Sequence, residues 1–293
     1  MSDSASPLML RRRLRTELCT ARLNKELTQE QVAKAMEWSL SKMNRIEKAK
    51  SSISINDLKA LLSLYGIADE ERIEDLLDLA RAVGRARTAR QSSWWKSYSA
   101  VAPPELLELI DYESAAFAIS QFETIFVPGI LQTEEYASAI LQVFYDEKSA
   151  AERVAALVDL RTRRRDLLIG DNAPKFSFVL DESVIHRLVG GSATASQQLR
   201  HLISMSDLPN VSIQIVPFTA GIHPGMKGPF ELIQFADMPD ENIVFRETTS
   251  GDTISDDPED TQNYLEAFER ITEVSLKPSD SVDRLRKAAS EME

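Results

Sequence analysis

Residues 39–50 bring together side chains that can bond the bases or the phosphates of a nucleic acid. Asn can bond adenine through two hydrogen bonds, Arg can bond guanine, and aliphatic methyls can touch the methyl of thymine. On this chemistry the candidate base-reading residues are Leu40, Ser41, Asn44 and Arg45. Phosphate contacts require only a donor or a positive charge, and the candidates are Gln29, Ser39, Lys42 and Lys50. The segment therefore predicts a nucleic-acid-binding surface.

Two short helices separated by a tight turn would position these side chains. Thr28 is followed three residues later by Gln31, the spacing of a capping box, so a helix is predicted from Thr28 to Met36. Ser39 can cap the next helix, which would run to about Lys48. Two helices of this length and separation form a helix-turn-helix unit, whose second helix enters the major groove of DNA.

Three more helices would complete the bundle around this unit. Apolar residues at helical spacing predict the first helix from Leu10 to Leu23. Ser54 can cap a fourth helix that Gly66 would end, and a fifth is predicted over about residues 69–87. A bundle of this kind could bind protein instead of DNA, but the polar and basic face of the third helix favours DNA.

The charge of the chain is divided unevenly along its 293 residues. The formal net charge is −12, yet residues 1–66 stand at +5 and residues 101–293 at −17. Phosphate contacts need local positive charge rather than a basic protein overall, so this division fits a small DNA-binding domain on a larger domain that does not bind DNA. A merely solvated basic helix is the alternative.

The N-terminal pattern resembles the Cro/repressor-like, or xenobiotic-response-element, family of bacterial helix-turn-helix regulators. The resemblance is carried by Arg22, residues 27–33 (LTQEQVA), residues 39–41 (SLS), residues 45–47 (RIE) and Leu58 to Gly66. It implies a partly buried ion pair between Arg22 and Glu47, and a homodimer on a pseudo-palindromic operator of double-stranded DNA. The family often has glycine where this chain has Glu26, Glu37 and Ala49. Keeping a left-handed turn without glycine would cost of order 1 kcal/mol at each position.

A linker is predicted at residues 88–104, where Pro103 and Pro104 interrupt any helix. Trp94 and Trp95 lie in this stretch, and because it is not strongly basic we favour an aromatic anchor over a base-stacking platform. The predicted organisation is therefore a disordered N-terminus (1–8), a helix-turn-helix DNA-binding domain (9–87), a linker (88–104), and a sensor, dimerisation or partner-binding domain (105–293).

The remainder of the chain mixes helical and alternating patterns. The predicted helices are Glu105–Gln121 (one or two), Glu134–Tyr145 after a Thr133 cap, Ala150–Ile169, Asp181 to Val189, Thr194–Met205, Asp257–Glu273 and Ser279–Glu291. The predicted strands are Phe176–Leu180, Val211–Val216, Phe230–Phe235 and Ile243–Glu247. The fold class is accordingly an N-terminal all-α helix-turn-helix bundle joined to a C-terminal α+β domain.

This second part resembles the C-terminal domain of a large family of actinobacterial, antitoxin-like transcriptional regulators. The most specific stretch is residues 127–137 (VPGILQTEEYA), supported by the paired tryptophans, residues 112–116 (YESAA), the arginines near residue 164 and residues 213–217 (IQIVP). The resemblance implies a repressor-like domain followed by a domain of poorly defined biochemistry, with links to development, antibiotic production and antitoxin-like gene pairs.

The sequence shows no arrangement typical of an enzyme, so we predict no catalytic residues, cofactor or metal. It lacks a phosphate-binding glycine loop, a zinc-protease motif and a nucleophile elbow, and its one cysteine, Cys19, excludes an internal disulfide. Asp181 with Glu182 fits a helix cap, and His223 lies in a glycine-rich connection that either is flexible or approaches a ligand. Arg161, Arg163, Arg164 and Arg165 are interpreted as inter-helix ion pairs plus a solvated patch, with contact to an anion as the alternative.

The leading hypothesis is a sequence-specific transcriptional regulator of development or secondary metabolism. The alternative is an antitoxin-like interaction module that neutralises a small partner protein from an adjacent gene and regulates its own operon. No apolar run long enough for a membrane span or a secretion signal occurs, so we expect a cytoplasmic, nucleoid-associated protein.

Overall fold

The computed structural model describes residues 7–48, 51–89, 93–145, 150–170, 172–236, 241–248 and 251–292. The chain divides into two compact units, Met1–Lys96 and Ser97–Glu293. No helix in the described residues has the length and apolar character that crossing a membrane requires.

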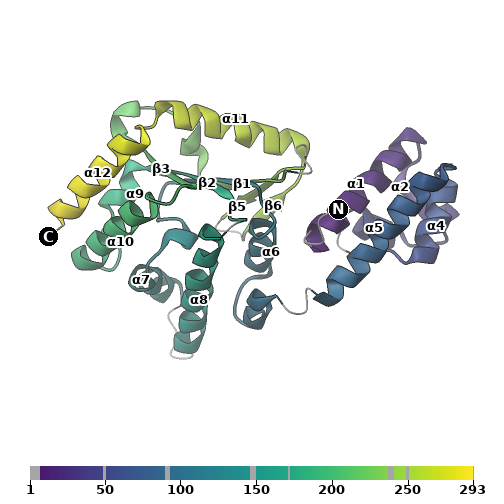
Figure 1. Ribbon diagram of the computed structural model, residues 1–293, viewed down its shortest axis with the longest axis horizontal. Coiled ribbons are helices and arrows are strands. Elements are labelled where there is room, and N and C mark those ends of the chain that lie inside the picture. The colour runs from purple at the N-terminus through teal and green to yellow at the C-terminus, as the bar shows by residue number, and fades with distance from the viewer. Residues whose placement is uncertain are drawn as a thin grey trace. The chain divides into compact units, whose positions relative to one another are not determined.

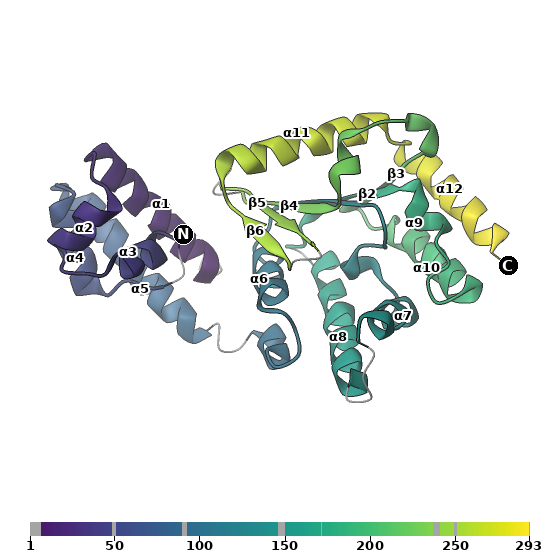
Figure 2. The same ribbon diagram turned by 180° about the vertical axis from the view of Figure 1, so that it is seen from behind.

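The first unit is a bundle of helices around its own apolar core (Figures 1 and 2). Leu18, Val32, Met43 and Leu58 come from four different helices and are almost fully buried, so each helix contributes one apolar face to the same core. The helices are α1 (Pro7–Asn24), α2 (Gln29–Ala35), α3 (Leu40–Glu47), α4 (Ile55–Leu64) and α5 (Glu70–Ala89).

Side-chain caps set the starts of three of these helices, as predicted. The Thr28 hydroxyl accepts from the Gln31 amide while the Gln31 side chain accepts from the Thr28 amide, a complete capping box. Ser39 and Ser54 cap α3 and α4 in the simpler way. Gly66 follows α4 with a φ of +73°, the left-handed conformation that ends helices at glycine.

Two turns of the first unit keep the left-handed conformation without a glycine. Glu26 and Glu37 both have a φ of 56°, and they occupy the turns before and after α2. The turn geometry that glycine usually provides is thus retained by a residue with a Cβ, which carries a conformational cost. Ala49, the third such position, lies outside the described residues.

The second unit is built on a six-stranded mixed sheet with strand order β3-β2-β1-β4-β5-β6. β1 (Ala118–Glu123) pairs in parallel with β2 (Lys175–Asp181), which pairs in parallel with β3 (Val211–Val216). On the other side of β1 the chain returns antiparallel through β4 (Phe230–Gln234), β5 (Ile243–Arg246) and β6 (Thr253–Ser255). The order of connection therefore reverses between β1 and β4.

Helices cover both faces of this sheet (Figures 1 and 2). α11 (Pro258–Val274) lies along one face, where Phe268 and Ile271 pack with Phe122 of β1. On the other face lie α6 (Pro104–Glu113), α7 (Glu134–Phe144) and α8 (Ala150–Arg164). The remaining helices are α9 (Glu182–His186), α10 (Ser192–Met205) and α12 (Pro278–Glu291). Because side chains alternate along a strand, the neighbours of Phe122 face α6, α7 and α8.

Two features of the sheet differ from the sequence prediction. The stretch Glu105–Gln121 was predicted as helix, but it ends its helix at Glu113 and forms β1 from Ala118. β1 lies between two partner strands, so ladder hydrogen bonds on both edges override the weak helical pattern. The second difference is β6, a three-residue strand that was not predicted. The predicted helix to Ile169 also ends earlier, at Arg164, and continues as a 3₁₀ turn.

The predicted linker contains ordered structure. α5 continues to Ala89, and a 3₁₀ helix covers Trp94–Tyr98, in which the rings of Trp94 and Trp95 meet edge to face with centroids 5.7 Å apart. The Tyr98 hydroxyl donates to the Asp159 carboxylate of α8. The chain is thus attached to α8 at the point where it enters the second unit.

Candidate functional site

The exposed side of α3 carries the four candidate base-reading residues. Met43 and Ile46 point into the core of the first unit, whereas Leu40 is 45% exposed and Ser41 and Arg45 are exposed. Asn44 is half-buried. α3 therefore presents one apolar face to the bundle and one face with hydrogen-bonding groups to solvent, as a recognition helix must.

The candidate phosphate contacts are in part occupied within the protein. The Ser39 hydroxyl caps α3 by accepting from the Lys42 amide at 3.1 Å. The Lys42 ammonium lies 3.0 Å from an Asp57 carboxylate oxygen of α4 and 3.9 Å from the centroid of the Trp38 ring. Lys42 is thus held close to the protein surface by an anion and an aromatic face. Lys50 lies outside the described residues.

A buried ion pair joins α1 to the end of α3. Arg22 Nε and Nη2 donate to the two Glu47 carboxylate oxygens at 2.6 and 3.1 Å, and the side chains are only 12% and 4% exposed. The side-chain amide of Gln29 donates to Glu47 Oε2 at 2.6 Å and so joins the ion pair, and its contact with a phosphate stays a prediction.

The charges of the pair affect their neighbours. The hydrogen bond to Glu47 raises the pKa of Arg22, while burial, with Glu47 as a second cause, raises the pKa of Cys19 to about 11. Burial and then Glu47 also raise the pKa of the Tyr65 hydroxyl. α3 is consequently fixed against α1 by a bidentate bond between the Arg22 guanidinium and the Glu47 carboxylate.

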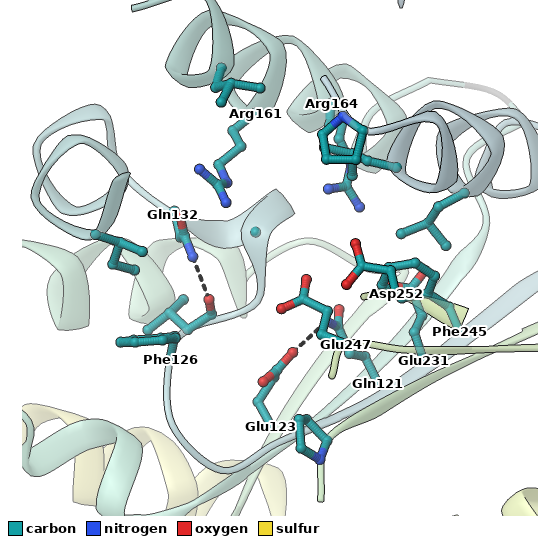
Figure 3. Close-up of a pocket in the computed structure, with 18 of the residues that line it drawn as sticks. Gln121, Glu123, Phe126, Gln132, Arg161, Arg164, Glu231, Phe245, Glu247 and Asp252 are labelled. Carbon is teal, nitrogen blue, oxygen red and sulfur yellow. Dashed lines mark hydrogen bonds between the residues drawn. The ribbon is translucent and has the colours of Figure 1, made fainter. Parts of the chain in front are cut away.

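A cavity of about 480 Å³ opens in the second unit between the sheet and α6, α7 and α8 (Figure 3). Gln121 and Glu123 of β1 and Glu231 of β4 line it from the sheet, because they alternate with Phe122 and face the opposite side. It lies against the carboxyl end of β1, where the order of connection in the sheet reverses. In open α/β sheets such switch points are the usual place for ligands, an analogy that favours a binding role.

One corner of the cavity is occupied by a buried ionic network. Arg164 donates from Nη2 and Nε to the Glu113 carboxylate at 2.5 and 3.1 Å, and both side chains are almost fully buried. Glu231 lies beside this pair, is 3% exposed, and has one carboxylate oxygen without a hydrogen-bond partner in the described parts of the chain. Burial, reinforced by the Glu113 charge, raises the pKa of Glu231 well above its ordinary value.

The open part of the cavity carries further titratable groups. Burial, with the charge of Glu247 as second cause, raises the pKa of Glu123 to about 8 and that of Asp252 to about 6. On the opposite wall, Figure 3 shows Arg161 of α8 directed into the cavity. Burial and the neighbouring Arg164 lower its pKa, and its buried Nη1 has no hydrogen-bond partner in the described residues.

The four arginines of the cluster have different surroundings. Arg164 forms the predicted inter-helix ion pair, Arg165 donates to the Gln132 carbonyl at 3.2 Å, and Arg163 is exposed beside Asp159. Arg161 pairs with no carboxylate in the described residues and instead lines the cavity, so contact with an anion stays a prediction for this side chain.

The glycine-rich segment near His223 serves packing. His223 is buried against Phe122 with ring centroids 5.8 Å apart, and its Nε2 lies 3.8 Å from an Asp181 carboxylate oxygen. A Cβ on Gly225 would lie 2.3 Å from the Phe122 ring, so the close approach permitted by glycine is to the sheet. Asp181 caps α9, and the buried Glu182 accepts from the Phe218 amide at 2.6 Å, as structural residues do.

The comparisons with known proteins agree with this division. Residues 11–76 match a helix-turn-helix domain, which together with the exposed face of α3 defines a DNA-binding regulator. Residues 106–287 match the domain of unknown function DUF5753, and the chain belongs to that family. No curated protein and no solved structure matches the chain.

Proposed function

We propose that this protein is a sequence-specific transcriptional regulator that binds a pseudo-palindromic operator as a homodimer. The observation that carries the proposal is the solvent-facing side of α3. This side carries Ser41, Asn44 and Arg45 and no acidic side chain of α3, and the Arg22–Glu47 pair fixes the helix on its buried side. A rigid helix with free hydrogen-bonding groups is what direct reading of bases requires.

The roles within the interface follow from these positions. Asn44 and Arg45, with Ser41 and Leu40, would read bases, and each good bidentate contact contributes about 1–3 kcal/mol of discrimination. Lys42 and Lys50 would act on phosphates and so contribute to all sequences alike.

Binding to single-base variants of an operator selected from the protein's own upstream DNA tests this assignment. Asn44→Ala and Arg45→Ala should each flatten the preference at one base pair per half-site, whereas Arg72→Ala on α5 is the matched control and should leave all preferences unchanged. Variants of Asn44 and Arg45 that weaken every sequence equally, with preferences kept, would show that α3 does not read bases.

Two-fold symmetry requires a dimer contact, and we propose that residues beyond about 88 supply it, because the apolar side chains of the first unit are mostly used in its own core. Light scattering should give a dimer for the full chain and a monomer for a fragment of residues 1–88. A full chain that stays monomeric at concentrations that saturate DNA would refute this.

The antitoxin-like alternative is favoured by one feature of the second unit. Phe218, Ile222 and Met226 lie in the connection between β3 and β4, and all three are largely exposed, with Ile222 94% accessible. Exposed apolar side chains so close in sequence can bind a partner protein. A gel-shift assay with and without the product of the adjacent gene distinguishes the regulator from the antitoxin-like module. If that product neither associates with the protein nor changes its DNA binding, the alternative is excluded.

A further inference from the structure

The cavity of the second unit holds more carboxylates than its cations can balance. Glu123, Glu247 and Asp252 line it, and none of the three forms an ion pair within the described parts of the chain. Arg164 is neutralised by Glu113, which leaves Arg161 as the one arginine of the lining that is free to act on a ligand. Even with a proton on Glu123, Glu247 and Asp252 outnumber Arg161, and this excess of acidic groups favours a cation.

We infer that this cavity binds a small organic cation with an apolar body and an oxygen acceptor near its charged group, as in an α-amino acid or an amine derived from one. Glu123, Glu247 and Asp252 would surround the ammonium group. Arg161, which enters from the opposite wall, would donate to the carboxylate or carbonyl oxygen (Figure 3).

Two buried polar groups of the cavity lining support a ligand that both accepts and donates hydrogen bonds. Among the described residues, Nη1 of Arg161 is a buried donor without an acceptor, and Oε1 of Glu231, on a side chain 3% exposed, is a buried oxygen without a donor. Leaving such groups unpaired costs free energy, and a ligand that supplies their missing partners recovers it. A purely apolar ligand would leave both unpaired.

The rest of the lining fits the apolar body. Phe126, Ile140, Phe144 and Leu157 also line the cavity, and they come from the loop after β1 and from α7 and α8. A volume of about 480 Å³ lies in the range of sites for small organic molecules.

A metal ion is a poorer occupant than an organic cation. Among the described residues no group of three or more Asp, Glu, His or Cys side chains is placed to hold a metal. The carboxylates of the cavity do not form such a group, and an ammonium group on an organic body needs only hydrogen-bond acceptors, not a complete shell of metal ligands.

Cation binding at this place should release protons. The groups facing Glu123 are Glu247 after β5, Gln121 on its own strand, Glu231 on β4 and Arg161 on α8. Burial holds a proton on Glu123 up to a pKa of about 8, and a positive charge placed beside it favours the ionised form. Binding near neutral pH is then accompanied by proton release, which a structural cavity would not show.

Isothermal titration calorimetry of the full chain tests the inference without DNA, so its outcome is independent of the proposed regulator function. The probes are the protein amino acids, their decarboxylated amines and their N-acetyl derivatives, titrated in two buffers of different ionisation enthalpy. We expect saturable binding of at least one amino acid or amine, with proton release, and at least about tenfold weaker binding of its N-acetyl derivative, because acetylation removes the cation.

Variants assign the binding to the cavity. Glu247→Gln should weaken binding at least about tenfold, while Glu269→Gln, an equal change of charge on the exposed side of α11, should have no effect. Arg161→Gln should weaken an amino acid more than the corresponding amine. Glu123→Gln should abolish proton release, and circular dichroism verifies that each variant is folded.

Three results would overturn the inference: no probe of the panel binds saturably, the N-acetyl derivative binds as well as its parent, or Glu247→Gln binds as the native protein does.

Discussion

Substitution of Glu47 by alanine should be among the most destabilising single changes in the first unit. It removes a carboxylate that accepts two hydrogen bonds from Arg22 and one from Gln29, all between 2.6 and 3.1 Å. The guanidinium of Arg22, with a side chain only 12% exposed, then keeps the Leu27 carbonyl as its one hydrogen-bond acceptor in the described residues. Stranding a buried charge in this way costs roughly 3–5 kcal/mol.

This loss is a large part of the stability of a small domain, so urea unfolding of a fragment of residues 1–96, followed by circular dichroism, measures it directly. Glu17→Ala breaks the exposed Arg72–Glu17 pair and is the matched control, with an expected cost of about 0–1 kcal/mol. The double variant Arg22→Met with Glu47→Leu should recover most of the loss, because it removes the stranded charge. A Glu47→Ala fragment within about 1 kcal/mol of the native one would refute the reasoning.

Three further predictions concern the turns, the phosphate contacts and the cavity. Glu26→Gly and Glu37→Gly should each raise the free energy of unfolding by about 0.5–1 kcal/mol, because both residues have a left-handed φ; unchanged or lower urea midpoints would contradict this. Asp57→Asn should strengthen binding to all DNA sequences, because it releases the Lys42 ammonium from its partner at 3.0 Å, and a steeper salt dependence of affinity is the measure; unaltered binding would show that Lys42 does not contact DNA. The folded state keeps a proton on Glu123 up to about pH 8, whereas the unfolded chain releases it near 4.5, so this carboxyl makes stability fall as the pH rises between those values. Glu123→Gln should flatten that part of the melting curve against pH, and an equally steep decline in the variant would place the titrating group elsewhere.

The first unit could be predicted from the sequence because its signals are short-range. The capping box of Thr28 and the cap at Ser39 each involve residues three apart, so the chain itself contains both partners of each interaction. The resemblance named the Arg22–Glu47 pair, whose members are in contact in the structure. What the pattern could not reveal was that Gln29 joins this pair, since that depends on how α2 lies against α3.

The cavity could not be predicted, because its charged groups come from distant parts of the chain. Glu123 and Glu231 line the same cavity only because β1 pairs with β4, and most of β1 was interpreted as helix. Arg161 and Arg164 were identified as a cluster, yet which of them is neutralised depends on the position of Glu113 at the end of α6. The one local signal was an acidic residue within an apolar strand, Glu231, where a charge is rarely buried without a reason.

Because Tyr98 is hydrogen-bonded to α8, this helix makes functional contacts on two of its sides. Asp159 accepts a hydrogen bond from the Tyr98 hydroxyl. Arg161, two residues further on, points into the cavity. Two residues correspond to roughly 200° around a helix axis, so the two side chains leave α8 in nearly opposite directions. We expect a rotation of α8 that moves Arg161 toward the carboxylates to move Asp159 as well, and with it Tyr98 at the start of the second unit.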